Sequence, residues 1–122
     1  MIDAFGCFPV DTPIQLINGD YKKISELNLG DILINRSEIR AILKVKGDKR
    51  NPYYKIWSKK LNKFIFVTGD HLIKHPINGE FIMVKDYENA QNTMTWDKEM
   101  TNLVTSNNNI PIGEFTFWDW ED

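Results

Sequence analysis

Cysteine is almost absent from this sequence: its 122 residues contain Cys7 and no second cysteine. An internal disulfide is therefore excluded, and no oxidising compartment is implied. No apolar run approaches the roughly 18 residues that a membrane-spanning helix needs. The first ten residues lack the basic start and the apolar core of a signal peptide. We therefore expect a soluble domain, and the sequence does not indicate its location.

The chain also lacks an excess of either charge, with 15 basic and 17 acidic side chains and a net charge of −2. This balance gives no electrostatic attraction for a nucleic acid or an anionic membrane, so neither is an expected partner. A chain of this length can bury enough surface to fold as one domain without a disulfide or metal. We expect a monomer with no cofactor.

Long helical periodicity is missing too, and short strand-like runs separated by turn residues take its place. Asn18-Gly19 and Asn78-Gly79 are strong hairpin signals. One helical turn is expected within 24–31 and a short helical piece near 87–91. The abundant aromatic residues are predicted to form core and cross-strand pairs. The sequence thus predicts an all-β fold of bent hairpins, with strands at 13–17, 21–23, 31–35, 39–45, 53–57, 64–68, 71–74, 81–84, 103–106 and 114–118.

Two segments carry side chains suited to chemistry, Gly6-Cys7 and the Thr68–His71 segment. Taken singly, a cysteine is most often a small buried apolar residue. A thiol is only a few per cent thiolate at neutral pH, so it needs a neighbour to act. Histidine can move protons because its pKa lies near neutrality, but only where it reaches the reacting atoms.

The order of these segments resembles that of inteins and hedgehog autoprocessing domains, which share the Hint fold. Residues 7–19 (CFPVDTPIQLING) resemble their first sequence block, in which a cysteine opens the domain, and the match continues through 23–27 and Gly30-Asp31. Residues 66–73 (FVTGDHLI) resemble their second block, whose core is Thr-x-x-His. The resemblance covers about 6–84 and is looser beyond. It implies a horseshoe-like, all-β Hint domain over 7–122, with 1–6 as the remnant of an upstream segment.

The resemblance also implies a reaction, an N–S acyl shift at the Gly6–Cys7 peptide bond. The Cys7 thiol attacks the adjacent Gly6 carbonyl with high effective molarity and forms a thioester. The resemblance makes His71 the proton donor to the leaving amine and Thr68 an oxyanion or orienting partner. Glycine suits the carbonyl side because it tolerates a strained backbone. The upstream polypeptide is then the substrate, released or transferred to water or a small nucleophile.

Two other features leave alternatives open. In hedgehog domains an aspartate in a context like that of Asp48 acts as a base in a second step, but Asp48 is equally well explained as a solvated loop carboxylate. His71 and His75 have the i, i+4 spacing of a zinc-binding helix, although Pro76 disfavours a helix there. In a strand both rings would share a face. No metal is expected, but zinc bound by His71, His75 and Cys7 stays an alternative.

The C-terminal part departs from the intein pattern. Splicing inteins end in His-Asn followed by Cys, Ser or Thr, and the nearest candidates here are Asn108 and Asn109. An asparagine cannot shuttle a proton where related sequences often carry histidine, and Ile110 offers no nucleophile. The tail 110–122 is predicted to be a folded, aromatic core strand. It resembles the ending of non-splicing Hint proteins in some viral and metazoan sequences, and no sterol-binding extension supports cholesterol transfer.

The hypothesis is therefore a single-turnover domain that cleaves its own chain at Gly6–Cys7. Three alternatives remain: a catalytically degraded Hint domain that serves as an interaction module, a protein-splicing intein, and a cysteine hydrolase acting in trans. The hydrolase would need an open cleft and a third residue to orient its histidine.

Overall fold

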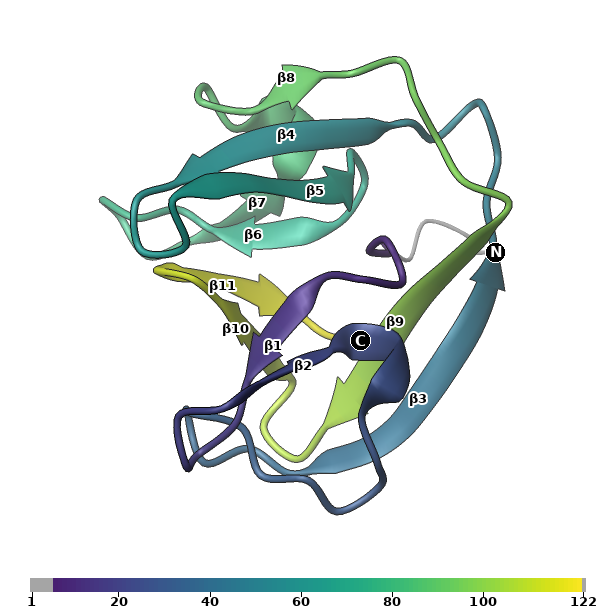
Figure 1. Ribbon diagram of the computed structural model, residues 1–122. Coiled ribbons are helices and arrows are strands. Elements are labelled where there is room, and N and C mark those ends of the chain that lie inside the picture. The colour runs from purple at the N-terminus through teal and green to yellow at the C-terminus, as the bar shows by residue number, and fades with distance from the viewer. Residues whose placement is uncertain (1–5, 122) are drawn as a thin grey trace.

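The computed structural model describes residues 6–121, and this part of the chain contains eleven short strands, two 3-10 turns and no α-helix (Figure 1). The predicted all-β fold is confirmed. Residues 1–5 of the proposed upstream remnant lie outside the described residues. The strands are β1 (Pro13–Gln15), β2 (Tyr21–Lys23), β3 (Ile39–Lys46), β4 (Tyr53–Ser58), β5 (Lys63–Thr68), β6 (Leu72–Lys74), β7 (Phe81–Met83), β8 (Gln91–Asn92), β9 (Glu99–Thr105), β10 (Asn109–Ile112) and β11 (Phe115–Trp118); the turns are η1 (Ile24–Glu26) and η2 (Val84–Asp86).

These strands form four small antiparallel sheets, ordered β1-β2, β3-β9, β5-β4-β8 and β10-β11-β6-β7. The β3–β9 ribbon is the longest pairing and runs from Ile39↔Thr105 to Lys46↔Glu99. In Figure 1 this ribbon descends on the right from the group of β4, β5 and β8 to the level of β1 and β2. No helix in residues 6–121 is long and apolar enough to cross a membrane.

Strand β9 of this ribbon also pairs with the start of the chain. Phe8 and Thr101 exchange both backbone hydrogen bonds, at 2.8 and 2.9 Å. On its other side the N-terminal segment meets the end of β5, where Thr68 N–H donates to the Cys7 carbonyl at 3.0 Å. Gly6 and Cys7 are therefore fixed between two strands that are distant from them in sequence.

Local turn chemistry explains the hairpins that the sequence predicted. Gly19 and Gly79 adopt φ of +95° and +76°, a left-handed conformation that glycine adopts readily. Asn62 does the same at φ 55° in the turn between β4 and β5, and asparagine tolerates this region better than most residues. The single turn expected within 24–31 is η1.

Two expected elements are wrong. Residues 31–35 form no strand; they make only isolated bridges, Leu16↔Leu33 and Ile32↔Glu38, because the chain turns tightly at Arg36, whose φ is 71°. The helical piece expected near 87–91 is absent as well. The chain forms η2 just before it and then β8, which pairs with β4. In both places pairing with a neighbouring segment decides a conformation that local propensity left ambiguous.

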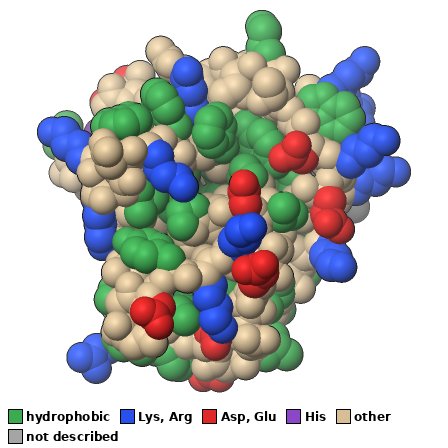
Figure 2. Space-filling view, viewed as in Figure 1, with side chains coloured by type: hydrophobic (Ala, Val, Ile, Leu, Met, Phe, Trp, Pro, Cys, Tyr) green, Lys and Arg blue, Asp and Glu red, His purple; other side chains and the backbone are tan. Residues whose placement is uncertain are grey.

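The core holds only part of the aromatic set. Phe8, Phe117 and Tyr87 are buried, as expected. Trp57 and Phe64, which form a cross-strand pair with ring centroids 5.0 Å apart, are instead 46% and 40% exposed. This pair lies on the outward face of the β4–β5 hairpin, so the expected aromatic pairs are not confined to the core. Figure 2 shows hydrophobic side chains among lysine and arginine on the upper half of the same view.

Candidate functional site

The Gly6–Cys7 peptide is held by a side chain at each of its polar atoms. The Cys7 N–H donates to the hydroxyl oxygen of Thr68 at 2.8 Å. On the other side, the Asn102 side-chain amide donates to the Gly6 carbonyl oxygen. Cys7 is 3% exposed and Asn102 is fully buried, so both contacts are shielded from water. A peptide held in this way has a donor at its carbonyl oxygen and an acceptor at its nitrogen.

Asn102 owes its position to β9. Its side-chain oxygen accepts the backbone N–H of Leu103 at 2.7 Å, which fixes the amide plane and leaves the NH₂ group for Gly6. A donor already aimed at a carbonyl oxygen can stabilise negative charge there without reorganising. Sequence reasoning missed this residue, since the strand was expected to begin at Leu103 and Asn102 matched no motif. The sequence offered one signal for Asn102: it is a polar residue directly before the apolar Leu103-Val104 pair.

His71 packs directly against Gly6. A Cβ built on Gly6 would collide with the Cα, Cβ and Cγ atoms of His71, so only glycine fits this position. The imidazole is buried and lies 4.5 Å from the Phe8 ring and 5.7 Å from the Phe117 ring, centroid to centroid. Glycine at the carbonyl side is therefore explained by close approach of the histidine.

The hydrogen bonds of His71 define its starting tautomer. Nε2 lies 2.6 Å from the carbonyl oxygen of Trp118, which can only accept, so Nε2 carries the proton. Nδ1 is buried without a hydrogen-bond partner among the described residues. Burial lowers the pKa of His71 to about 4, although the bond to Trp118 and the charge of Asp70 oppose the shift. His71 is thus neutral near pH 7, with an available lone pair on Nδ1.

A buried neutral histidine makes stability depend on pH. The pKa is 6.5 in the unfolded chain and about 4 in the folded protein. Between these values the unfolded state binds more protons, so stability is full above about pH 6.5 and falls as the pH drops toward 4. We expect a loss of about 3 kcal/mol across this window from His71. Urea unfolding from pH 4.5 to 7.5 measures it.

His71→Gln should reduce the pH slope of the unfolding free energy, while His75→Gln is the matched control. His75 lies at the surface end of β6 beside Glu88, with Nε2 3.2 Å from the carboxylate. The control should lose less of the wild-type slope than His71→Gln does. An equal slope in wild type and His71→Gln would contradict the assignment.

The Cys7 thiol is not activated at rest. Burial, and secondly the charge of Asp70, raise its pKa to about 12. A thiolate is thus not present beforehand at neutral pH, so this thiol could act as a nucleophile only after losing its proton to a base.

Asp70 connects this site to a neighbouring loop. Its Oδ1 accepts the Thr68 hydroxyl at 3.0 Å and the Asn51 amide at 2.9 Å. Asp70 lies in the turn between β5 and β6. This turn packs closely on Tyr54, because a Cβ on the preceding Gly69 would lie 2.6 Å from the Tyr54 ring. Asp70 and Asn51 were not among the candidate residues, although Asp70 stands inside the Thr-x-x-His segment.

Solved structures share this fold over nearly the whole chain. The crystal structure of the Ssp DnaB mini-intein variant M86 matches with a TM-score of 0.74 and 14% sequence identity, covering 100% of this chain and 99% of that one. The crystal structure of the gp41-1 intein matches with a TM-score of 0.63 and 17% identity, covering 93% and 98%. This chain has the Hint fold. No protein-family model and no curated protein sequence matches it.

In this Hint domain the predicted residues Gly6, Cys7, Thr68 and His71 lie together. The contacts refine two of the expected roles. Thr68, expected as an oxyanion or orienting partner, lies at the nitrogen of the Gly6–Cys7 bond, and the side-chain donor at the Gly6 carbonyl oxygen is Asn102. His71 already donates from Nε2 to the Trp118 carbonyl, but its Nδ1 carries a lone pair, so Nδ1 must gain a proton before it can donate one.

Asp48 lies at the edge of the Hint site. A cavity of about 470 Å³ is lined by Cys7, Asp48, Asp70 and Trp120, among others. The Asp48 carboxylate forms two hydrogen bonds with the Arg50 guanidinium, at 2.7 and 3.0 Å. This pairing lowers the pKa of Asp48 to about 2, which makes it a poor base. The position fits a part in the site, but the ion pair favours the solvated-carboxylate alternative.

Asn108 and Asn109 lie beside residues that contact the site: Asn109 pairs with Trp118, whose carbonyl oxygen bonds to His71. Asn108, with φ 64°, directs its amide toward the buried Asp119 carboxylate at 3.3 Å, and Asp119 N–H donates to the Asn108 carbonyl at 2.9 Å. Asn109 is paired with Trp118 in β10–β11. The strand that follows these asparagines carries buried Phe117, so the expected core strand is confirmed.

The zinc alternative finds no support in the Hint domain. The His71 ring lies in the core beside Phe8, whereas the His75 ring packs against Tyr87, with centroids 5.5 Å apart. Among residues 6–121, no three His, Cys, Asp or Glu side chains lie close enough together to hold a metal ion.

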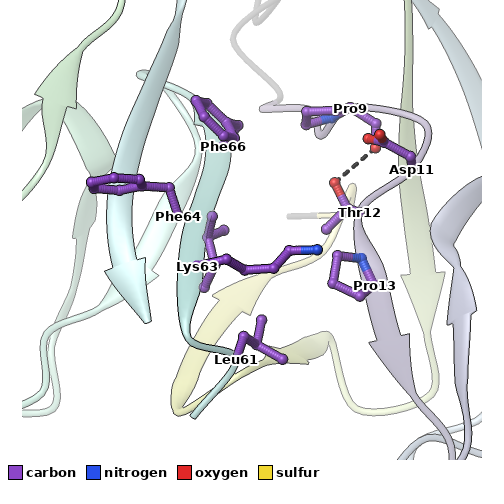
Figure 3. Close-up of a pocket in the computed structure, with 9 residues that line it drawn as sticks. Pro9, Asp11, Thr12, Pro13, Leu61, Lys63, Phe64 and Phe66 are labelled. Carbon is purple, nitrogen blue, oxygen red and sulfur yellow. Dashed lines mark hydrogen bonds between the residues drawn. The ribbon is translucent and has the colours of Figure 1, made fainter. Parts of the chain in front are cut away.

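A second hollow lies between the 9–13 segment and β5, apart from the Cys7 site. It has a volume of about 240 Å³. Figure 3 shows Lys63 reaching across it toward Thr12 and Pro13, while Thr12 donates to the Pro9 carbonyl at 2.7 Å. None of the candidate catalytic side chains lines this hollow.

Proposed function

We propose that this domain breaks its own Gly6–Cys7 peptide bond by an N–S acyl shift. The observation that carries the proposal is the pair of contacts on that bond, with Asn102 at the carbonyl oxygen and Thr68 at the nitrogen. The first contact stabilises charge that develops on oxygen, and the second holds the nitrogen that departs. Together they favour the transition state of acyl transfer at this one peptide.

The reaction balances in one proton cycle. Nδ1 of His71 takes the thiol proton as Cys7 Sγ attacks the Gly6 carbonyl carbon. Negative charge forms on the Gly6 oxygen, where Asn102 donates. The C–N bond then breaks, and His71 returns the proton to the Cys7 nitrogen. The products are a thioester on Sγ and an amine, and water or a small nucleophile then releases the upstream segment from the thioester.

Burial favours attack within the chain over hydrolysis in trans. Cys7 is 3% exposed, and the donor and acceptor of the site are already occupied by the chain's own peptide. An external substrate would have to displace Gly6 from His71, against which it packs without room for a Cβ.

Protein splicing is a second candidate, favoured by the end of β11. His71 bonds to the Trp118 carbonyl, and Trp120 packs against the cluster of Cys7, Tyr53 and Met100, so the C-terminal segment reaches the same site. The two solved neighbours are named as inteins. Against splicing, cutting at Asn108 or Asn109 would separate β11, which pairs with β6, covalently from the rest of the domain. We therefore limit the proposal to the N-terminal junction.

A fusion protein with a reporter domain upstream of Gly6 tests this proposal. We expect slow release of the reporter, faster with an added thiol such as dithiothreitol, because the thiol attacks the thioester. Cys7→Ala should abolish release, while Ile77→Ala, at an 88% exposed position, should not change it. A gel time course measures the rate. A persistent intact fusion in a folded wild-type chain would favour the interaction-module alternative.

A further inference from the structure

We infer that Asp70 is a positioning residue for this reaction: its carboxylate fixes the Thr68 hydroxyl so that the hydroxyl oxygen faces the Cys7 N–H. The inference rests on the proposed acyl shift for its catalytic meaning. The hydrogen-bond arrangement itself is independent of activity, which allows the two to be tested separately.

The direction of the hydrogen bonds carries the inference. A threonine hydroxyl has one proton, and here it goes to Asp70 Oδ1 at 3.0 Å. The lone pairs of the same oxygen are then left for the Cys7 N–H at 2.8 Å. Without an acceptor at position 70 the hydroxyl proton of Thr68 would have no partner. The hydroxyl group could then rotate and direct this proton toward the Cys7 nitrogen. A charged acceptor makes the observed direction strongly preferred.

Asp70 is itself held from outside the reacting peptide. The Asn51 amide donates to Oδ1 at 2.9 Å, and Gly69 N–H donates to the Pro52 carbonyl at 3.3 Å. A hydrogen-bonded series therefore runs from the loop before β4 through Asp70 and Thr68 to the nitrogen of the scissile bond. Such a series orders the acceptor before the reaction begins.

The negative charge of Asp70 has a separable effect. It contributes to the raised pKa of Cys7, after burial, and it opposes the lowered pKa of His71. Asp70→Asn keeps an oxygen acceptor for Thr68 but removes the charge. We therefore expect Asp70→Asn to keep most of the cleavage rate at neutral pH and to shift the pH profile of cleavage to lower pH.

Removal of the acceptor should act through Thr68. We expect Asp70→Ala and Thr68→Val each to slow cleavage by about 10-fold to 100-fold, the worth of a hydrogen bond to a charged group. The double variant should be no slower than the slower single variant, because both changes remove one arrangement. Asp86→Asn, at an exposed carboxylate in η2, is the matched control and should cleave at the wild-type rate.

A measurement that does not depend on cleavage, hydrogen exchange of the residue-7 amide, separates this inference from the proposed function. In a Cys7→Ala background, which cannot cleave, the residue-7 amide still meets Thr68. We expect Asp70→Ala to speed hydrogen exchange of that amide at least about 10-fold, with the core amide of Leu103 unchanged. If Asp70→Ala does not fold, Asp70→Glu, which misplaces the carboxylate, carries the same expectation. Unchanged residue-7 exchange, or additive rate losses in the double variant, would overturn the inference; an inactive wild-type fusion with altered exchange would overturn only the proposed function.

Discussion

Replacing Asn102 with alanine is expected to slow cleavage at Gly6–Cys7 by about 10²-fold to 10³-fold, the usual cost of removing one oxyanion donor. The Asn102 amide is the described side-chain donor at the Gly6 carbonyl oxygen, and it is buried, so water cannot replace it easily. The loss should appear in the first-order rate of thioester formation, measured with excess thiol.

Two further variants show whether the effect belongs to the donor. Asn102→Asp keeps the shape but places a carboxylate oxygen where the NH₂ group donates, so it should be at least as slow as alanine. The exposed Asn28→Ala is the matched control and should cleave normally. A folded Asn102→Ala variant, shown by an unchanged melting transition, that cleaves at the wild-type rate would exclude Asn102 from the reaction.

Replacing His71 with glutamine is expected to slow cleavage by about 10²-fold to 10⁴-fold, the range typical of a lost proton-transfer group. Glutamine can still donate to the Trp118 carbonyl and fill much of the space, but it cannot take up and return a proton. In wild type the rate should fall as the pH drops toward about 4, because protonation of His71 removes the base. A time course from about pH 3.5 to 8 measures both effects.

His75→Gln serves as the control for the His71 experiment, since His75 follows β6 and pairs with Glu88 instead of contacting Gly6. It should leave both the rate and its pH dependence unchanged. If His71→Gln cleaves as fast as wild type, the proton acceptor is a different group near Cys7, and Asp70, which lines the same cavity as Cys7, is then the first to examine.

The sequence was sufficient for the hairpins because their turns are local. Asn18-Gly19 and Asn78-Gly79 contain the left-handed glycines that such turns use. It failed at residues 31–35 and 87–91, where short apolar or polar runs take their conformation from pairing with other segments of the chain. Local propensity carries no information on such partners.

The residues of the candidate site also fall into those that the sequence could predict and those that depend on distant contacts. Cys7, Thr68 and His71 were found because their order and spacing resemble known sequence blocks. Asn102 was not, because its role depends on β9 lying beside the N-terminal segment, a contact between residues 96 positions apart. For Asp48, the sequence left a base and a solvated carboxylate both open, because its motif context did not reveal the Arg50 ion pair that lowers its pKa.

The central claim, acyl transfer from nitrogen to sulfur at Gly6–Cys7, is tested most directly by intact-mass spectrometry of the upstream fusion incubated with dithiothreitol. We expect two products, an upstream fragment ending at Gly6 that carries dithiothreitol as a thioester and a domain beginning with Cys7. Hydroxylamine should convert the first product to the hydroxamate. Intact fusion alone, a cut at another bond, or the same products from Cys7→Ala would contradict the claim.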